Sequence, residues 1–173
     1  YMEAYSDFAS VYDRLMADVD YKARTEYILK LFKKYGKTPT LLLDLACGTG
    51  SVSVLLAQMG MSVTAVDMSE EMLCVASEKA SQLDCPPVFV CQKLQQLHLP
   101  KGVDLAVCAL DSLDYILDPA DCKEAIRRIY KVLNPGGCFI FDVNTPKKLK
   151  DMDGQVFLDE DDDVQMVYHN WDE

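Results

Sequence analysis

Two acidic residues and two glycines have the types and spacing of a ligand site. Gly48 and Gly50 end the segment LLLDLACGTG (residues 41–50), where an apolar strand passes into a helix. A backbone without Cβ atoms can approach a ligand closely, and the helix offers free N–H groups at its positive end. Asp67 ends the next strand, where a carboxylate can accept hydrogen bonds from both ribose hydroxyls. A cap for the helix near Ser69 is the competing explanation, but loop and acid together favour an adenosine-type nucleoside.

Asp44 separates the candidate ligands by charge, because it lies in an otherwise apolar strand just before the glycines. A carboxylate there would repel a pyrophosphate but suits a cation. S-adenosylmethionine carries a sulfonium and an ammonium group and no phosphate, so charge favours it over NAD or ATP. The chain also has no GxxxxGKS or GxxxxGKT phosphate loop.

An unpaired carboxylate beside a buried strand would be costly, so Asp44 must have partners. We expect these to be backbone N–H groups of residues 46–50, the ammonium group of the ligand through water, or both.

Alternating strand-like and helix-like stretches must position these residues. Unbroken apolar or β-branched runs predict strands at residues 41–46, 62–66, 88–91, 103–110 and 138–143. Apolar residues at helical spacing and capping signals predict helices over 51–60, from Ser69 to about residue 83, and over 121–133. The sequence NPGG at 134–137 predicts a turn.

This order of elements predicts an α/β fold with a doubly wound, mainly parallel sheet and helices on both faces. Strands separated by helices pair in parallel through right-handed crossovers, and strands apolar throughout are covered on both sides. Ligands of such sheets bind beyond the carboxyl ends of the strands, where the acids and glycines fall.

The chain divides into three predicted regions. Residues 1–36 form a helical lid segment, residues 37–145 the cofactor-binding core, and residues 146–173 an acidic segment that starts a substrate-side insertion. Within the last region, we expect the acidic run 159–163 to be a solvated loop and 164–171 to be an extended strand.

Charge and composition disfavour several classes of function. The net charge is −11, and residues 151–173 contain many acids and no Lys or Arg, so the rest is nearly neutral without a basic stripe. That disfavours nucleic-acid binding. No apolar run is long enough for a membrane span, and no signal-peptide pattern opens the chain. Seven cysteines without disulfide or zinc spacing, and two histidines, predict free thiols, a cytoplasmic location and no metal site.

Four motifs together resemble the class I S-adenosylmethionine-dependent methyltransferases. They are DLACGTG at 44–50, VDMS at 66–69, LNPGG at 133–137 and FDV at 141–143. The segments FASVYDRLM and DSLDYI resemble a bacterial small-molecule subgroup that includes amino-sugar N-methyltransferases. The resemblance covers about residues 38–145 and implies a Rossmann-like methyltransferase fold. The family continues with further strands, so the resemblance also implies that this chain lacks the last strands of the fold.

The resemblance assigns one group of residues to the methionine end of the cofactor. The backbone around Ala46, Cys47 and Gly48 would lie under the methionine part. Ala109 and Leu110 would face the sulfonium.

Three further residues belong to the mouth of this site. Tyr5 and Tyr12, in the N-terminal segment, would close over the cofactor. Asp111 would contact the cofactor or cap a helix. Asp111 and Tyr12 are also the candidates for a general base, but no catalytic residue is assigned.

A second group belongs to the nucleoside end. Asp67 would hold the ribose hydroxyls, and Met68 would pack on the adenine. Lys93 and Leu94 would lie where the family reads the adenine edge. The family often has Asp at the position of Lys93, and a Lys cannot accept a hydrogen bond from the adenine amino group. Either the main chain alone reads the adenine, or binding is weaker.

The predicted function is transfer of a methyl group from S-adenosylmethionine to a small soluble acceptor by direct displacement, which leaves S-adenosylhomocysteine. One alternative is an NAD(P)-linked Rossmann oxidoreductase, because GTGSVS resembles the dinucleotide fingerprint. The other is a non-catalytic module that binds S-adenosylmethionine.

Overall fold

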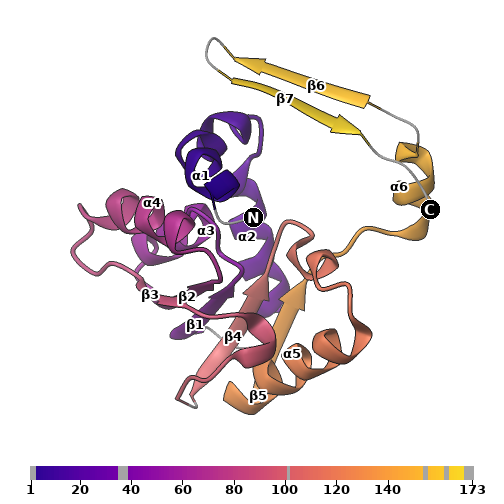
Figure 1. Cartoon of the computed structure of the whole chain (residues 1–173). Coiled ribbons are helices and arrows are strands. Elements are labelled where there is room, and N and C mark those ends of the chain that lie inside the picture. The colour runs from indigo at the N-terminus through magenta and orange to yellow at the C-terminus, as the bar shows by residue number, and fades with distance from the viewer. Residues whose placement is uncertain (1–2, 35–38, 101, 154–155, 162–163, 170–173) are drawn as a thin grey trace.

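A five-stranded parallel sheet with strand order β3-β2-β1-β4-β5 forms the centre of the molecule (Figure 1). The computed structural model describes residues 3–34, 39–100, 102–153, 156–161 and 164–169. The strands are β1 (Leu41–Leu45), β2 (Ser62–Asp67), β3 (Val88–Cys91), β4 (Val103–Cys108) and β5 (Leu133–Phe141). The doubly wound fold predicted from the sequence is confirmed, and its order reverses between β1 and β4, where ligands of such folds bind.

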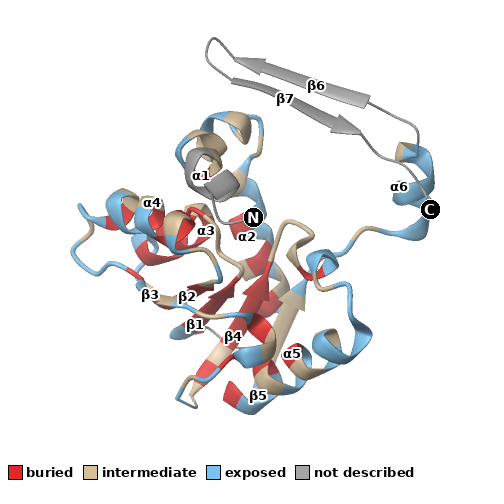
Figure 2. Cartoon of the chain, viewed as in Figure 1, coloured by how far each residue is buried: buried red, intermediate tan, exposed pale blue. Residues whose placement is uncertain are grey.

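Helices cover both faces of this sheet. On one face, α2 (Tyr21–Lys33) and α3 (Ser51–Gln58) bury Phe32 and Leu56 against β1 and β4. On the other face, α5 (Pro119–Val132) buries Ile129 against a second cluster that includes the short helix η1 (Leu94–Gln96). The central strands β1, β2 and β4 contain the buried residues of the sheet, whereas the edge strands β3 and β5 are only partly buried (Figure 2). Burial on both sides explains why the central strands are mostly apolar.

Four more helices complete the described structure. They are α1 (Glu3–Leu15), α4 (Glu70–Ala80), η2 (Ser112–Tyr115) and α6 (Pro146–Met152). Ser69 caps α4 as predicted, since its hydroxyl accepts the N–H of Met72 at 3.2 Å. α4 packs against β2, β3 and α1, so the N-terminal helix lies next to the central domain.

The segment 134–137, predicted as a turn, lies within β5 as a bulge. Val103 pairs with Leu133 but Leu105 pairs with Cys138, so β5 has extra residues between these two pairs. Gly136 has a φ of 76°, and a Cβ on Gly137 would lie 3.0 Å from the carbonyl oxygen of Asn134. The two glycines therefore allow the extra residues to bulge out while β5 continues on both sides of them.

A two-stranded antiparallel sheet follows α6. It consists of β6 (Val156–Asp161) and β7 (Val164–His169), which confirms the extended segment predicted from residue 164 up to residue 169. The prediction of a loop was wrong for residues 159–161, because their backbone pairs with β7; residues 162–163 and 170–171 lie outside the described residues. Acidic side chains are tolerated on a strand with one unpaired edge, which explains why composition alone misled here.

At the amino edge of the sheet, Asp104 joins the starts of three strands. Its carboxylate accepts the N–H groups of Thr40 (3.1 Å) and Leu41 (3.3 Å), the hydroxyl of Thr40 (3.0 Å) and the amide of Asn134 (2.8 Å). The hydrogen bond from Asn134, more than any other contact, lowers the pKa of Asp104 to about 2. This brace therefore ties β1, β4 and β5 together at the end opposite the glycine loop.

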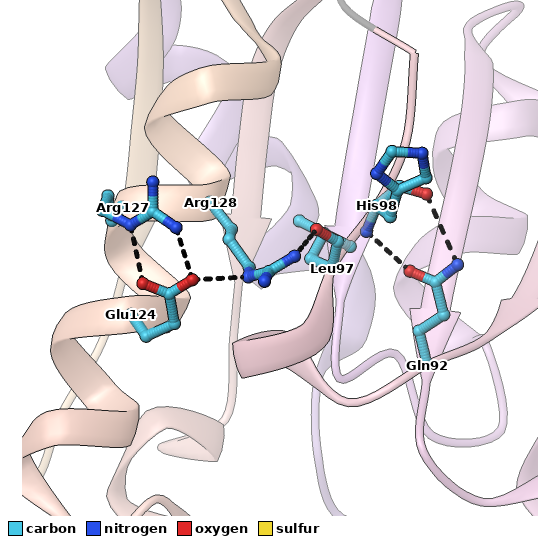
Figure 3. A network of polar contacts seen from close by, with 6 residues as sticks. All are labelled: Gln92, Leu97, His98, Glu124, Arg127 and Arg128. Carbon is cyan, nitrogen blue, oxygen red and sulfur yellow. Dashed lines mark hydrogen bonds and ion pairs between the residues drawn. The ribbon is translucent and has the colours of Figure 1, made fainter.

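A second polar network joins α5 to η1 (Figure 3). Glu124 accepts hydrogen bonds from Arg127 and Arg128, and Arg128 also donates to the carbonyl of Leu97 at 3.0 Å. Beside it, Gln92 accepts the backbone N–H of His98 at 2.9 Å. These contacts fix the segment between β3 and β4. The backbone of His98 takes part in them through its bonds with Gln92.

Within the residues that the structure describes, no helix is long and apolar enough to cross a membrane, and no group of His, Cys, Asp and Glu could hold a metal. All seven cysteines are free, as predicted.

Candidate cofactor-binding site

A pocket opens at the carboxyl ends of β1 and β4. Its lining includes seven residues that the sequence analysis singled out: Tyr12, Asp44, Ala46, Cys47, Gly48, Ala109 and Leu110. Tyr21, Thr49, Ser51, Val52 and Ser112 complete the lining. The structure thus brings together the N-terminal segment, the glycine loop and the end of β4, which are far apart in the sequence.

The glycine loop has an unusual backbone whose N–H groups at Cys47, Gly48 and Gly50 bond within the protein, to the carbonyl of Val66, the carboxylate of Asp67 and the carbonyl of Cys47. Ala46 (φ 51°), Gly48 (φ 54°) and Gly50 (φ 73°) all have left-handed conformations, which are rare for a residue with a Cβ such as Ala46. A Cβ at Gly50 would lie 2.9 Å from the Cβ of Ala76, so this glycine also allows close packing on α4. Strained backbone of this kind is concentrated at functional sites.

Asp67 closes the loop from the end of β2. One carboxylate oxygen accepts the N–H of Gly48 at 2.8 Å, and the other accepts the N–H of Ser69 at 2.9 Å. A carboxylate has room for about four hydrogen bonds, so both oxygens can still accept from hydroxyl groups. Asp67 therefore orders the loop, and the cap of α4 belongs to Ser69.

Asp44 is 3 % exposed and lies beneath the pocket. Its carboxylate accepts a hydrogen bond from the hydroxyl of Ser53 at 2.5 Å, and the backbone of Ser53 also bonds to it. This partner is on α3, whereas the sequence analysis expected loop N–H groups of residues 46–50. Burial raises the pKa of Asp44 to about 7, with a smaller contribution from the charge of Asp67, and Ser53 opposes the rise. A cation in the pocket would favour the ionised carboxylate.

Cys47 lines the pocket, and its surroundings disfavour the thiolate form. Burial, and next the nearby charges of Asp44 and Asp67, raise the pKa of its thiol, which therefore stays protonated.

The end of β4 has two more left-handed residues, Leu110 (φ 63°) and Asp111 (φ 57°). Leu110 lines the pocket, but the Asp111 carboxylate pairs with Lys148 of α6 at 3.2 Å and is not among the lining residues. The N–H of Asp111 donates to Asp142 at 3.2 Å. Asp111 therefore holds the backbone turn through its N–H, and its carboxylate is engaged by Lys148.

The residues expected at the adenine end lie outside the pocket lining. Met68 follows Asp67 and is 66 % exposed, and Lys93 is exposed at the start of η1. The side chain of Leu94 is buried in the core. The two exposed residues, Met68 and Lys93, thus follow the ends of β2 and β3 in the chain.

Tyr21 is a pocket residue that the sequence analysis missed. Its hydroxyl is buried near Tyr12 and Ser51, and within the described residues it makes no hydrogen bond of normal geometry. Burial raises its pKa, and the charge of Asp13 adds to the rise. The side chain of Tyr5 lies outside the described residues, so Tyr12 and Tyr21 are the described tyrosines at this pocket.

Comparisons with known proteins identify the class to which this fold and pocket belong. The model of the methyltransferase domain family matches residues 42–137, more than half of the chain, so the chain belongs to this family. A crystal structure of an S-adenosylmethionine-dependent methyltransferase from Clostridium acetobutylicum is similar to it, with a TM-score of 0.85 and 36% identity, over 98% of this chain and 70% of that one. The resemblance to class I methyltransferases is thereby confirmed.

Two relatives found by sequence agree with this. YqeM of Bacillus subtilis is 36% identical over 169 residues, which cover 96% of this chain and 66% of YqeM. Glycine N-methyltransferase of Rattus norvegicus is 31% identical over 136 residues, or 71% of this chain and 45% of that enzyme. The chain thus spans about two thirds of the first relative and less than half of the second.

Proposed function

We propose that this chain binds S-adenosylmethionine in the pocket between β1 and β4 and transfers its methyl group to a small-molecule acceptor. The observation that carries the proposal is the meeting of the left-handed loop, Asp67 and a buried Asp44 at one edge of the sheet. Family membership and the similar S-adenosylmethionine-dependent structure support the cofactor. They favour it over the dinucleotide of the oxidoreductase alternative.

The residues present fit this cofactor. Asp44 is buried with Ser53 as its partner and has a raised pKa, so a sulfonium and an ammonium group would supply the positive charge that the site lacks. The free lone pairs of Asp67 suit two ribose hydroxyls. Exposed Met68 offers an apolar surface for adenine.

Bound S-adenosylmethionine supplies an electrophilic methyl group, which an acceptor atom takes in a direct displacement. The protein then has to align the acceptor and exclude water, and orientation of this kind can lower a barrier by roughly 7–11 kcal/mol. Tyr12 and Tyr21 line the pocket, and we infer that they limit the access of water to it. Asp111 is held by Lys148, so we assign it no proton transfer.

The name of a relative supports a small-molecule acceptor. The name of the rat relative specifies glycine, a small amine, and this chain is 31% identical to it. We also propose a role for each of three regions of the chain. Residues 1–36 form a lid, residues 37–145 bind the cofactor, and residues 146–173 lie on the acceptor side.

Calorimetry with S-adenosylmethionine, S-adenosylhomocysteine and NAD tests the cofactor. We expect the first two to bind and NAD to show no heat; binding of NAD alone would favour the oxidoreductase. Release of S-adenosylhomocysteine in the presence of an acceptor library then tests turnover. Cofactor binding without any turnover across amines, phenols and acids would favour the non-catalytic module.

A further inference from the structure

An ionic cluster beside the pocket joins α1 to the rest of the molecule. We propose that Asp13 and Lys79 form a latch that positions α1, and with it Tyr12, over the pocket. Asp13 and Lys79 are positioning residues in this proposal, which rests on the proposed function because the gated ligand is the cofactor.

The latch consists of four side chains from three segments. The Asp13 carboxylate of α1 accepts the Thr49 hydroxyl at 2.6 Å and pairs with Lys79 of α4 at 2.7 Å. Lys79 also donates to the hydroxyl oxygens of Thr49 at 3.2 Å and Ser51 at 3.0 Å. Asp13 is thus the acceptor for both the Thr49 hydroxyl and the Lys79 ammonium group. Loss of the Asp13 carboxylate would leave the Thr49 hydroxyl and one N–H of Lys79 without an acceptor.

These contacts reach the pocket directly. Thr49 and Ser51 belong to its lining, and so does Tyr12, the residue before Asp13. Thr49 is only 1 % exposed, while the side chains of Lys79 and Asp13 are 27 % and 39 % exposed. Charge-assisted hydrogen bonds to a buried hydroxyl are stronger than an ordinary surface ion pair.

The size of the pocket gives the latch a function. Its free space is about 40 Å³, far below the roughly 300–1,000 Å³ typical of ligand sites. In our proposal, the methionine end of the cofactor needs more space than this, and a movement of Tyr12 supplies it. Because Tyr12 and Asp13 are neighbours on one helix, that movement would stretch or break the contacts of Asp13 with Thr49 and Lys79.

Rates of S-adenosylhomocysteine binding to the full chain test the latch. Asp13→Asn and Lys79→Met should each raise both the association and the dissociation rate, by about tenfold, since each frees α1 to open. The double variant should be no faster than the singles, because both remove the same interaction. Glu124→Gln, which breaks a comparable network on α5 far from the pocket, serves as the matched control and should leave both rates unchanged.

Loss of a direct ligand contact would speed dissociation alone, so an unchanged association rate would overturn the latch. Hydrogen exchange of the ligand-free chain gives an independent test. Amides of α1 should lose protection in Asp13→Asn but not in Glu124→Gln, with the strand amides unchanged; equal protection of α1 in both would also overturn the proposal. Failure of the wild-type chain to bind would instead contradict the proposed function, and the exchange result would still decide the latch.

Discussion

At the scale of single residues, the site depends on carboxylates whose surroundings differ sharply. Asp44 is buried with a raised pKa, whereas Asp67 is partly exposed and bonded to two backbone N–H groups. In our proposal, Asp44 therefore faces the cationic part of the ligand and Asp67 its hydroxyl groups.

We predict that Asp67→Ala weakens S-adenosylhomocysteine binding by about 1.5–3 kcal/mol, the range for hydrogen bonds to a charged group. Calorimetry measures the change, and circular dichroism should show the fold intact, since the variant also loses the contacts with Gly48 and Ser69. Unchanged affinity in a folded variant would remove Asp67 from the ribose site.

Lys93 gives the opposite expectation. It is exposed and, having only donors, cannot accept a hydrogen bond from the adenine amino group. Lys93→Asp should therefore leave S-adenosylhomocysteine binding equal or tighter, as read by the same titration. A clear loss of affinity would reveal a favourable contact of Lys93 with the ligand.

Asp44 makes stability depend on pH. Its folded pKa of about 7 lies above the value of 3.8 for a free side chain, so the folded chain holds a proton that the unfolded chain has already lost. The free energy of unfolding should fall as pH rises from about 4 to 7, by a few kcal/mol, and then level off. Urea denaturation at pH 5 and pH 8 measures this decrease in the free energy of unfolding. In Asp44→Asn, the decrease between the two pH values should be smaller, because the Asp44 carboxyl is absent.

The same variant tests the charge argument. Asp44→Asn keeps the shape of the side chain, so it should weaken S-adenosylmethionine and S-adenosylhomocysteine, which carry an ammonium group, more than plain adenosine. Equal losses for the three ligands would make Asp44 a structural brace only.

At the scale of elements, the glycine loop and α4 are built against each other. A Cβ at Gly50 would meet Ala76 of α4 at 2.9 Å and Phe89 of β3 at 3.3 Å, and the φ of 73° disfavours a side chain as well. Gly50→Ala should therefore cost roughly 1–3 kcal/mol of stability, measured by denaturation. Gly60→Ala is the matched control, because it has a similar φ of 83° with no atom near the added Cβ. If both variants lost the same amount, strain alone would explain the effect.

The amino edge of the sheet provides the second prediction at this scale. Asp104→Ala should destabilise the fold, since it removes the acceptor for Thr40, Leu41 and Asn134. Binding of S-adenosylhomocysteine to the folded fraction should be unchanged. The lowered pKa of Asp104 means that its own stabilisation is complete above about pH 4 and is lost as pH falls toward 2. A binding defect in the folded variant would show that the two edges are coupled.

At the scale of the whole molecule, the sequence predicted the sheet, the parallel direction of its strands and their positions, because mostly apolar runs such as 41–45 and 103–108 are typical of strands covered on both faces. It also placed Asp44, the glycine loop and Leu110 at one edge. These positions follow from the order of strands and helices along the chain, which local sequence patterns predict.

What the sequence did not predict depends on side-chain packing across the fold. The partner of Asp44 proved to be Ser53, and only the phase of α3 against β1 brings the two together, although a buried acid always requires a nearby donor. Tyr21 belongs to no motif, and its place at the pocket follows from the packing of α2. The bulge in β5 was missed because glycines and a proline indicate a turn whether or not the strand resumes its register.

The brace at Asp104 has a consequence for how this molecule can change over time. It lies at the amino edge, while the pocket lies at the carboxyl edge of the same strands. Mutations that erode or reinforce folding at one edge can accumulate without altering what is recognised at the other. Substitutions in the pocket loops that change the ligand often destabilise a fold. In a descendant of this sequence, contacts at the amino edge of the sheet could compensate for that loss of stability.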